Sequence, residues 1–398
     1  MIAKPLRVAL CADFPEERWP SMDRVAATLL DGLRVNHAET IEVRAVVPPF
    51  ARRAMRLSGR DTGPAYTVDR FLNRLWDYPR HVARLVADYD VFHIVDSSYA
   101  HLAHRLPASR TVVTCYDLDT FRSLLQPGEE PRSPLFKAMT RHVLSGLRRA
   151  ARVTCATSAI RDEILSRQLL VPGRVSVVPL GVSPAFSSRP DPDADRAAAA
   201  LLGLAPGATM LLHVGSTVGR KRIDVLLEIV GRLRAETPGL RLVRVGSPFT
   251  NDQRRLAQTL GLTETVVALD GVDDRTLAAV YRRAALVLLP SDREGFGFAL
   301  VEAMACGTPV VASDLDVLRE VGGAAAEYCP PGDAPQWVRR IVELLHVRRH
   351  DPDRWQARID GGIAQARRFS WTRFAASLVQ LYGEVAAEAG RLRAQSSS

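Results

Sequence analysis

Short runs of apolar, β-branched residues alternate with longer stretches of helical periodicity along the whole chain. Near-continuous hydrophobicity in runs this short is typical of parallel strands that are covered on both faces. The stretches between them, such as "DRVAATLLDGLRV" and "SAIRDEILSRQLL", place apolar residues at helical spacing. The alternation predicts a doubly wound α/β sheet. In the first half of the chain the predicted strands are Leu6–Ala12, Ile41–Val47, Asp90–Asp96, Thr111–Asp117, Arg152–Ser158 and Val175–Gly181.

A second set of strands follows a break in this pattern. The segment "VSPAFSSRPDPDADRAAAALLGLAPGAT" is rich in proline, serine and aspartate, which is typical of a linker. A chain of 398 residues is also too long for one compact core. We therefore predict a first domain at 1–185, a linker at 186–205, a second domain at 206–368 and a helix at 369–398 that packs back on the first domain. The second set of strands is predicted at Thr209–Gly215, Leu240–Gly246, Thr265–Gly271, Ala285–Ser291 and Thr308–Asp314.

The composition is that of a soluble globular protein with a positive charge. Its 53 basic and 44 acidic residues give a net charge of +9, which suits an anionic partner. With 6% aromatic residues to stack bases, nucleic acid is not expected as that partner. No apolar run reaches the roughly 18 residues of a membrane span, and the N-terminus reads as a strand, not a signal peptide. Five scattered cysteines are typical of a reducing cytoplasm, so we expect a cytoplasmic chain without disulfides or a zinc site.

Two glutamates frame a glycine-rich apolar run, "SDREGFGFALVEAMACGTPVVASD" (291–314). Glu294 is predicted in a loop before a helix, and Glu302 lies inside that helix. Gly295 and Gly297 let the backbone approach a ligand and leave N–H groups at the positive helix end, where a phosphate fits. In the plainer interpretation, Glu294 is an acidic residue in the first turn that the helix dipole favours, and Glu302 lies on the solvent-exposed face of the helix. The apolar neighbours of Glu302 argue against that interpretation and predict a half-buried carboxylate.

A cluster of cations, Arg220–Lys221–Arg222, follows the strand that ends at Gly215 and is predicted to open a helix. Cations at a helix N-terminus oppose the helix dipole, so they are unfavourable there unless an anion is bound. The cluster therefore predicts a phosphate or diphosphate clamp, although an exposed basic face is the plainer alternative. The pattern G-x-x-x-x-G-K-[ST] of nucleotide hydrolases is not matched, and no G-x-G-x-x-G follows the first strand.

The run 291–314 resembles the E-x7-E signature of the retaining GT-B glycosyltransferases of family 4, also called group 1. The segment "HVGSTVGRKRIDVLLE" is similar to their diphosphate segment, "VVPLGV" to the element that closes their N-terminal domain, and "FSWTRFAASLVQLYGEV" to their C-terminal helix. The resemblance spans nearly the whole chain, and the E-x7-E block is its most specific part. It implies two Rossmann-like domains that face a cleft, with a nucleotide-sugar donor bound mainly to the second.

Carried over residue by residue, the resemblance implies a role for each charged side chain. Glu302 holds the donor ribose, Glu294 holds hydroxyls of the transferred sugar, and Lys221 with Arg220 neutralises the diphosphate. Because these cations and a helix end supply the charge, no metal or other cofactor is expected, and the two D-x-D strings are interpreted as capping residues. The further positions that the resemblance places at the donor are Gly215, Ser216, Gly295, Phe296, Gly297, Phe298 and Leu300.

The sequence departs from the family pattern at two positions. Ser216 stands where the family usually has arginine, and Arg220 or Arg222 is a candidate substitute. Tyr116 occupies the place of a histidine that lines the cleft beside the transferred sugar. Its phenol has an unperturbed pKa of about 10, so it is a different acid–base partner from imidazole. His93 lies nearby, although a lone histidine in an apolar strand is more often a core residue.

The sequence thus predicts a retaining, metal-independent glycosyltransferase that moves a sugar from a nucleotide-sugar donor to a hydroxyl acceptor. That acceptor is a sugar, a lipid-linked or a small molecule, and its candidate neighbours are Ser21 (a predicted N-cap), Met22 and Asp117. Two alternatives stay open: a catalytically attenuated relative that binds a nucleotide sugar or a protein, and a GT-B epimerase. The basic helices of the first domain fit peripheral contact with the anionic inner face of the plasma membrane; a solvated arginine face fits them at least as well.

Overall fold

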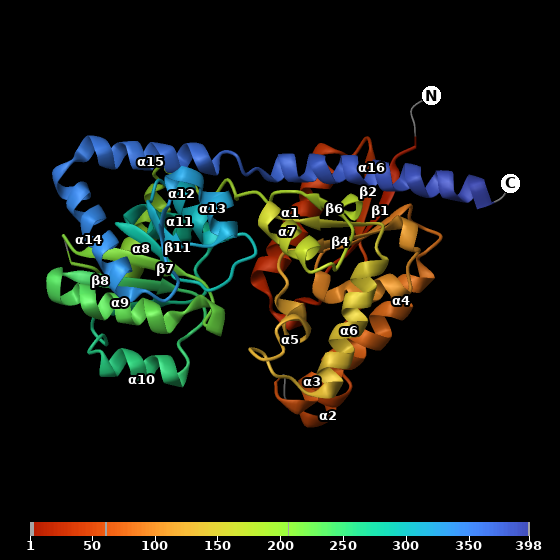
Figure 1. Ribbon diagram of the computed structural model, residues 1–398, viewed down its shortest axis with the longest axis horizontal. Coiled ribbons are helices and arrows are strands. Elements are labelled where there is room, and N and C mark those ends of the chain that lie inside the picture. The colour runs from red at the N-terminus through yellow and green to blue at the C-terminus, as the bar shows by residue number, and fades with distance from the viewer. Residues whose placement is uncertain (1–3, 60–61, 206, 397–398) are drawn as a thin grey trace. The chain divides into compact units, whose positions relative to one another are not determined.

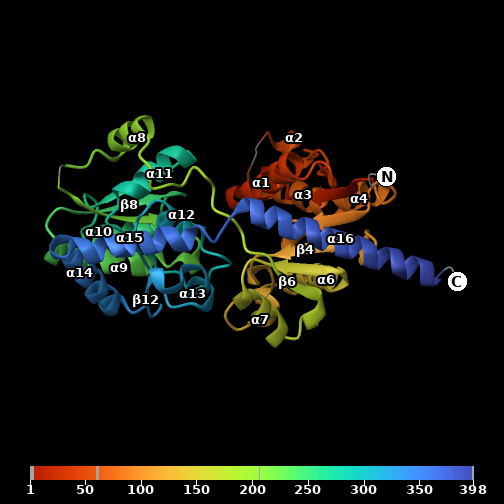
Figure 2. The same cartoon turned by 90° about the horizontal axis from the view of Figure 1, so that it is seen from above.

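Two compact units make up the chain. The computed structural model describes residues 4–59, 62–205 and 207–396. The first unit takes in the described residues up to Pro179 and from Trp371 onward, and the second unit is Leu180–Ser370. Each unit holds one sheet of six strands flanked by helices (Figures 1 and 2). The predicted architecture of two doubly wound α/β units is confirmed.

The sheet of the first unit has the strand order β2-β1-β3-β4-β5-β6, and every neighbouring pair is parallel. The strand order reverses between β1 and β3, because the chain goes from β1 to β2 on one side and returns to β3 on the other. The strands are β1 Leu6–Cys11, β2 Ile41–Ala45, β3 Val91–Ile94, β4 Thr111–Cys115, β5 Arg152–Cys155 and β6 Val175–Val177. The helices are α1 Pro20–Asn36, α2 Ala54–Ser58, α3 Pro64–Leu72, α4 Tyr78–Arg84, α5 Arg122–Leu125, α6 Pro134–Arg149, α7 Ser158–Ser166 and α16 Trp371–Ser396.

Helix α16 packs along the first unit, as Figures 1 and 2 show in blue. Its buried residues Phe374, Leu378 and Val385 recur at helical spacing and form an apolar stripe. The stripe contacts α1 and β3, and farther along the helix Arg152 and Glu388 form an ion pair at 2.5 Å. The C-terminal helix therefore contributes to the core of a domain that begins more than 300 residues earlier in the chain.

His93 on β3 is a core residue that ties α16 to the sheet. Its Nδ1 lies 2.6 Å from the Tyr382 hydroxyl of α16, and its Nε2 lies 2.7 Å from Thr114 Oγ1 on β4. Burial lowers the pKa of His93 to about 3, so the ring is neutral at physiological pH. Both ring nitrogens have partners, and the histidine has the structural role that its apolar strand indicated.

The sheet of the second unit has the order β12-β11-β10-β7-β8-β9, again all parallel. Its edge strand β12 was not predicted, because three residues are too few to show a hydrophobic pattern. The strands are β7 Thr209–Val214, β8 Leu240–Val245, β9 Val266–Leu269, β10 Leu286–Leu289, β11 Val310–Ser313 and β12 Glu327–Cys329. The helices are α8 Pro192–Leu202, α9 Ile223–Glu236, α10 Asn251–Thr259, α11 Asp274–Arg283, α12 Phe298–Ala305, α13 Asp316–Gly322, α14 Ala334–His350 and α15 Pro352–Ala366.

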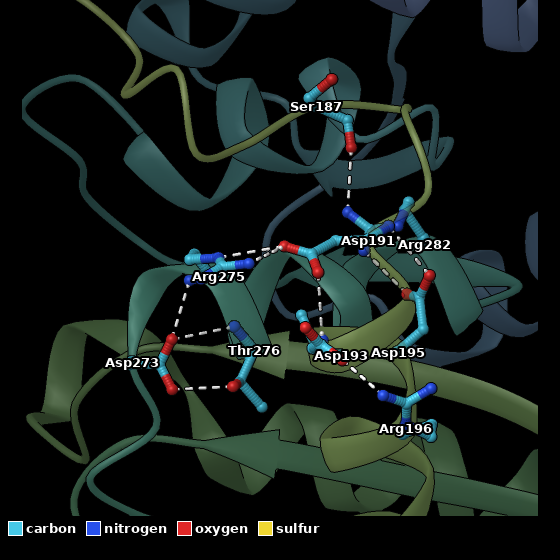
Figure 3. Close-up of polar contacts among 10 residues, drawn as sticks. Ser187, Asp191, Asp193, Asp195, Arg196, Asp273, Arg275, Thr276 and Arg282 are labelled. Atoms are coloured by element: carbon cyan, nitrogen blue, oxygen red, sulfur yellow. Dashed lines mark hydrogen bonds and ion pairs between the residues drawn. The ribbon is translucent and has the colours of Figure 1, made fainter.

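The structure differs from the predicted linker at 186–205, because α8 lies within it and packs on α11 (Figure 3). Asp191 caps α8 and accepts two hydrogen bonds from Arg275, at 2.7 and 3.0 Å. One turn later, Asp195 pairs with Arg282 at 2.7 Å. The aspartates that suggested a solvated linker therefore cap a helix and bind the arginines of its neighbour.

Two further features concern the helices and the cysteines. Among the described residues, no helix is both long and apolar enough to cross a bilayer. All five cysteines are buried and none is disulfide-bonded, and burial raises the pKa of the Cys11 thiol to about 12. These thiols are packing residues with little nucleophilic character.

Tyr382→Phe is expected to loosen α16 on the first unit. The change removes the hydroxyl that pairs with Nδ1 of buried His93, and an unsatisfied buried polar atom costs about 1–3 kcal/mol. Hydrogen–deuterium exchange of the α16 amides should become faster. Gln380→Ala, on the exposed side of the same helix, is the control and should exchange like the wild type. Equal protection of α16 in Tyr382→Phe and wild type would contradict the role given to this hydrogen bond.

Candidate active site

Glu294 lies in the loop between β10 and α12, and its side chain is buried, with 8% exposure. Lys221 Nζ is 2.6 Å from its Oε1, and Arg220 Nη1 is 3.4 Å from its Oε2. Ser291 Oγ also donates to Oε1, at 2.7 Å. A carboxylate is tolerated at such burial only when paired and hydrogen-bonded, and these three partners meet that requirement.

The protonation state of Glu294 follows from these contacts. Burial by itself would raise the pKa of this carboxyl group. The charges of Lys221 and Arg220, with the hydrogen bonds from Lys221 and Ser291, outweigh burial and lower the pKa below its usual value of 4.5. Glu294 is therefore ionised at neutral pH, and its oxygens act as hydrogen-bond acceptors, the role needed to hold sugar hydroxyls.

The three cations of the cluster pair with three carboxylates, because Arg222 contacts Asp224 at 2.9 Å as well as Asp292. Arg220 and Lys221 lie in the short turn Gly219–Lys221 and Arg222 is the N-cap of α9, so the cluster directly precedes the helix that it was predicted to open. Arg220 and Lys221 face Glu294, whereas Arg222 pairs with Asp292 at 3.0 Å. Of the two candidate substitutes for the family arginine, Arg220 is the one at Glu294.

The turn after β7 is held by buried polar groups that the sequence analysis missed. Gly246 has φ of +130°, and a Cβ on it would lie 2.2 Å from the carbonyl oxygen of Gly215, so a side chain cannot be accommodated. Fully buried Arg244 donates to the same carbonyl at 2.8 Å, and burial lowers its pKa to about 10. His213 is also buried. Its burial, followed by the positive charges of Lys221 and Arg244, lowers its pKa to about 3. The sequence did contain a signal for these two residues. His213 and Arg244 are polar side chains within apolar strands, each two residues before the glycine that follows the strand.

The N-terminus of α12 begins directly after the Glu294 loop. Gly297 at its N-cap has φ of +91°, and a Cβ there would lie 2.7 Å from Leu318, so glycine is required. Phe296 and Leu300 point their side chains into the core, and the Leu300 amide donates to the Gly297 carbonyl at 2.9 Å. The Leu300 amide is thus already engaged, and Phe296 can serve a donor only through its backbone; the helix dipole favours an anion at this end of α12.

Glu302 lies inside α12 and is 5% exposed, so the alternative of a solvated carboxylate is wrong. Its Oε2 accepts a hydrogen bond from the hydroxyl of Tyr281 at 2.9 Å. Tyr281 comes from α11 and is itself fully buried. Its position twenty-one residues away in sequence explains why the sequence pattern did not reveal it as the partner of Glu302.

Tyr116 lies in the first unit, just beyond β4, with 9% exposure. Burial first, and then the nearby charges of Asp96 and Asp13, raise the pKa of its phenol well above the usual value. The hydroxyl therefore keeps its proton at physiological pH and can donate a hydrogen bond. These two aspartates were not singled out in the sequence, although Asp13 directly follows one predicted strand and Asp96 ends another.

The acceptor-side candidates also lie in the first unit. The predicted N-cap at Ser21 is wrong, because α1 begins at Pro20 and its N-cap is Trp19; Ser21 is exposed in the first turn. Met22 is half-buried. Asp117 is also half-buried and accepts a hydrogen bond from the amide of Asp119 at 2.9 Å.

Comparison with known proteins gives two family matches that together span most of the chain. A sequence model described as "Glycosyl transferases group 1" matches residues 199–359, and one described as "Glycosyltransferase Family 4" matches residues 22–186. A protein named D-inositol 3-phosphate glycosyltransferase from Thermobispora bispora is 35% identical over 59% of this chain and 56% of its own length. One of the same name from Streptosporangium roseum is 29% identical over 84% of this chain and 81% of its own length. The chain spans about half the length of several other such relatives.

Solved structures resemble both units together with the C-terminal helix. Sucrose-phosphate synthase from Thermosynechococcus elongatus matches with a TM-score of 0.75 and 20% identity, over 96% of this chain and 99% of that one. The Anabaena protein HepE, in complex with UDP-glucose, matches with a TM-score of 0.68 and 17% identity, over 96% of this chain and 100% of that one. At these identities the likeness shows the fold.

Glu294→Gln is expected to destabilise the second unit in a pH-dependent way. Removing one partner of a buried ion pair costs about 3–5 kcal/mol. Because the folded-state pKa of Glu294 is depressed, its contribution is fully present above about pH 4.5 and is lost as pH falls through that lowered value. The difference in urea midpoint between wild type and variant should therefore shrink below pH 4.5, whereas exposed Glu236→Gln should shift the midpoint little. A difference that stays constant down to pH 3 would contradict an ionised, paired Glu294.

Proposed function

Because the chain belongs to the group 1 glycosyltransferases with the GT-B fold, we propose that it transfers a sugar from a nucleotide-sugar donor to a hydroxyl group of an acceptor. The proposal includes retention of anomeric configuration and no requirement for a divalent metal. The observation that carries it is the buried ion pair of Lys221 and Glu294, with Arg220 beside it, at the start of α12.

The charges of this site fit the departure of a diphosphate. As the bond between the sugar and the donor phosphate breaks, negative charge grows on the phosphate oxygens. Lys221, Arg220 and the N-terminus of α12 are positive groups already fixed in place, and such preorganised charge stabilises the transition state most effectively. Because these groups supply the neutralising charge, a metal ion is not needed in the proposed reaction.

Glu294 fits the role of holding the sugar better than that of a nucleophile. Its oxygens are engaged by Lys221, Arg220 and Ser291, and ion pairing lowers the nucleophilicity of a carboxylate. In the proposed step the acceptor oxygen bonds to the anomeric carbon on the face from which the diphosphate leaves. The acceptor proton passes to the departing phosphate oxygen, so no protein nucleophile is invoked.

The comparisons suggest which substrates to test first. Structures of the Anabaena protein contain UDP and UDP-glucose, which supports UDP-sugars as the first donors to try, beside GDP-, ADP- and dTDP-sugars. Several sequence relatives are named for D-inositol 3-phosphate, so a phosphorylated polyol is one candidate acceptor. A thermal-shift screen of the four donor classes identifies the nucleotide.

Lys221→Ala and Glu294→Ala are each expected to lower transfer strongly. Loss of one preorganised charge at a transition state costs roughly 100- to 1000-fold in turnover. Product formation is measured by mass spectrometry with EDTA present, and wild-type transfer should persist under that condition. Arg232→Ala, on the exposed face of α9, is the matched control and should retain activity. Wild-type turnover in both site variants would defeat the assignment.

A second candidate function is motivated by Tyr116, which stands where the family has histidine. In this alternative the chain is an attenuated relative that binds a nucleotide sugar without efficient transfer. Tyr116→His separates the two functions, because a missing acid–base group is worth roughly 100- to 10,000-fold in rate. We expect no gain of that size, since the protonated phenol already donates a hydrogen bond; a gain of about 100-fold or more would favour the attenuated relative.

A further inference from the structure

The first unit holds buried carboxylates that the proposed donor site does not use, and Asp13 is one of them. Asp13 lies two positions beyond the end of β1, and Asp96 lies two positions beyond the end of β3. The last residues of these strands, Cys11 and Ile94, are partners in the parallel ladder. The strand order of this sheet reverses between β1 and β3, and ligands of open α/β sheets bind at such points.

Asp13 has an unsatisfied oxygen. Its side chain is 5% exposed, and its Oδ1 has no hydrogen-bond partner within the described part of the chain. The carboxyl group is hydrogen-bonded to Asp96, whose own oxygens accept from the amide and hydroxyl of Ser98 at 2.8 and 3.0 Å. Buried polar atoms without partners are rare in folded proteins, so an oxygen placed at this point indicates a ligand that donates a hydrogen bond.

The carboxyl group of Asp13 holds its proton more tightly than a free carboxyl group does. Burial first, and then the charge and hydrogen bond of Asp96, raise the pKa of Asp13 well above its usual range. Arg74 acts in the opposite direction but does not outweigh them. Tyr116 follows β4, the strand that pairs with β3 on its other side, and the charges of Asp96 and Asp13 both act on its phenol. The group therefore offers hydroxyl donors and carboxylate acceptors together, which is the chemistry that sugar hydroxyls require.

The neighbouring cations are already bound to another carboxylate. Glu17 is buried and pairs with Arg70 and Arg74, each at 3.0 Å. Arg74 also stacks 4.1 Å from the ring centre of Tyr99 and donates to the backbone carbonyl of Ser98. Three acidic side chains and two arginines thus share this region, and both arginines are held by Glu17. Among the described residues, the arginines that could neutralise a phosphate dianion beside Asp96 are shared with Glu17, so binding the dianion there is disfavoured.

We propose that Asp13, Asp96 and Tyr116 form the acceptor subsite, and that this subsite selects an uncharged polyol or sugar over its phosphate ester. The inference rests on the proposed glycosyl transfer and names the class of its acceptor. The proposed acceptor therefore lacks the phosphate that appears in the name of the relatives, D-inositol 3-phosphate glycosyltransferase. The Asp13 oxygen receives an acceptor hydroxyl, Tyr116 donates to another, and the charge on Asp96 opposes a phosphate.

The test uses matched acceptors that differ by one phosphate: inositol and inositol 3-phosphate, glucose and glucose 6-phosphate, glycerol and glycerol 3-phosphate. The donor is whichever of UDP-, GDP-, ADP- and dTDP-glucose stabilises the wild type most. We expect the wild type to favour the uncharged member of a pair by about tenfold or more in kcat/KM, because like charges at a binding site are strongly disfavoured. Asp96→Asn should reduce the preference for the uncharged acceptor, measured as the ratio of the two kcat/KM values. Asp13→Asn should raise KM for the uncharged acceptor. Exposed Asp88→Asn is the control and should keep the wild-type ratio; melting temperatures verify that all variants fold.

Three outcomes would overturn the inference. Wild-type preference for a phosphorylated member, or a ratio unchanged in folded Asp96→Asn, contradicts the subsite alone. Donor hydrolysis without transfer to any uncharged acceptor also contradicts the subsite while leaving the donor chemistry in place. A wild type that neither binds nor hydrolyses any of the four donors contradicts the proposed function itself.

Discussion

The second unit depends on one constraint, the need to neutralise the buried carboxylate of Glu294. Lys221 neutralises this carboxylate from a different loop. The turn after β7 and the loop after β10 must therefore lie within hydrogen-bond distance of each other. The backbone contributes as well, since the Asp292 amide donates to the Arg220 carbonyl at 2.8 Å. β7 and β10 are neighbours at the point where the strand order of this sheet reverses. The topology therefore brings the two loops together, and the ion pair fixes their positions.

The two units place opposite chemistry at the same topological position. In the second sheet the reversal point carries Arg220 and Lys221 around the ionised carboxylate of Glu294, which suits an anionic diphosphate. In the first sheet it carries Asp13, whose pKa is raised by burial and by Asp96, and the nearby arginines are held by Glu17. Open α/β sheets leave this point available in every case, so the side chains after the strands determine what each unit binds.

The hydrophobic pattern identified the strands and helices well where a segment was long and regular. It failed for short or polar elements, because it reports burial along one segment and not the contacts that stabilise it. Helix α8 is stabilised by arginines of α11, and its aspartates alone looked like a linker. The edge strand β12 is stabilised by pairing with β11, and three residues show no periodicity. Helix α1 begins at Pro20 with Trp19 as its N-cap, whereas the sequence pattern had predicted Ser21 as the N-cap.

By itself the sequence determined the α/β class and the two units. It also singled out the charged groups that meet before α12, because the E-x7-E spacing and the cation cluster are local features of one segment each. Tertiary structure decided which groups meet. It paired Glu302 with Tyr281, turned Arg222 toward Asp292 and brought Asp13 beside Asp96. The physical reason is that a buried polar atom must find its partner in space, and in a doubly wound sheet that partner is supplied by strand order, which no single segment encodes.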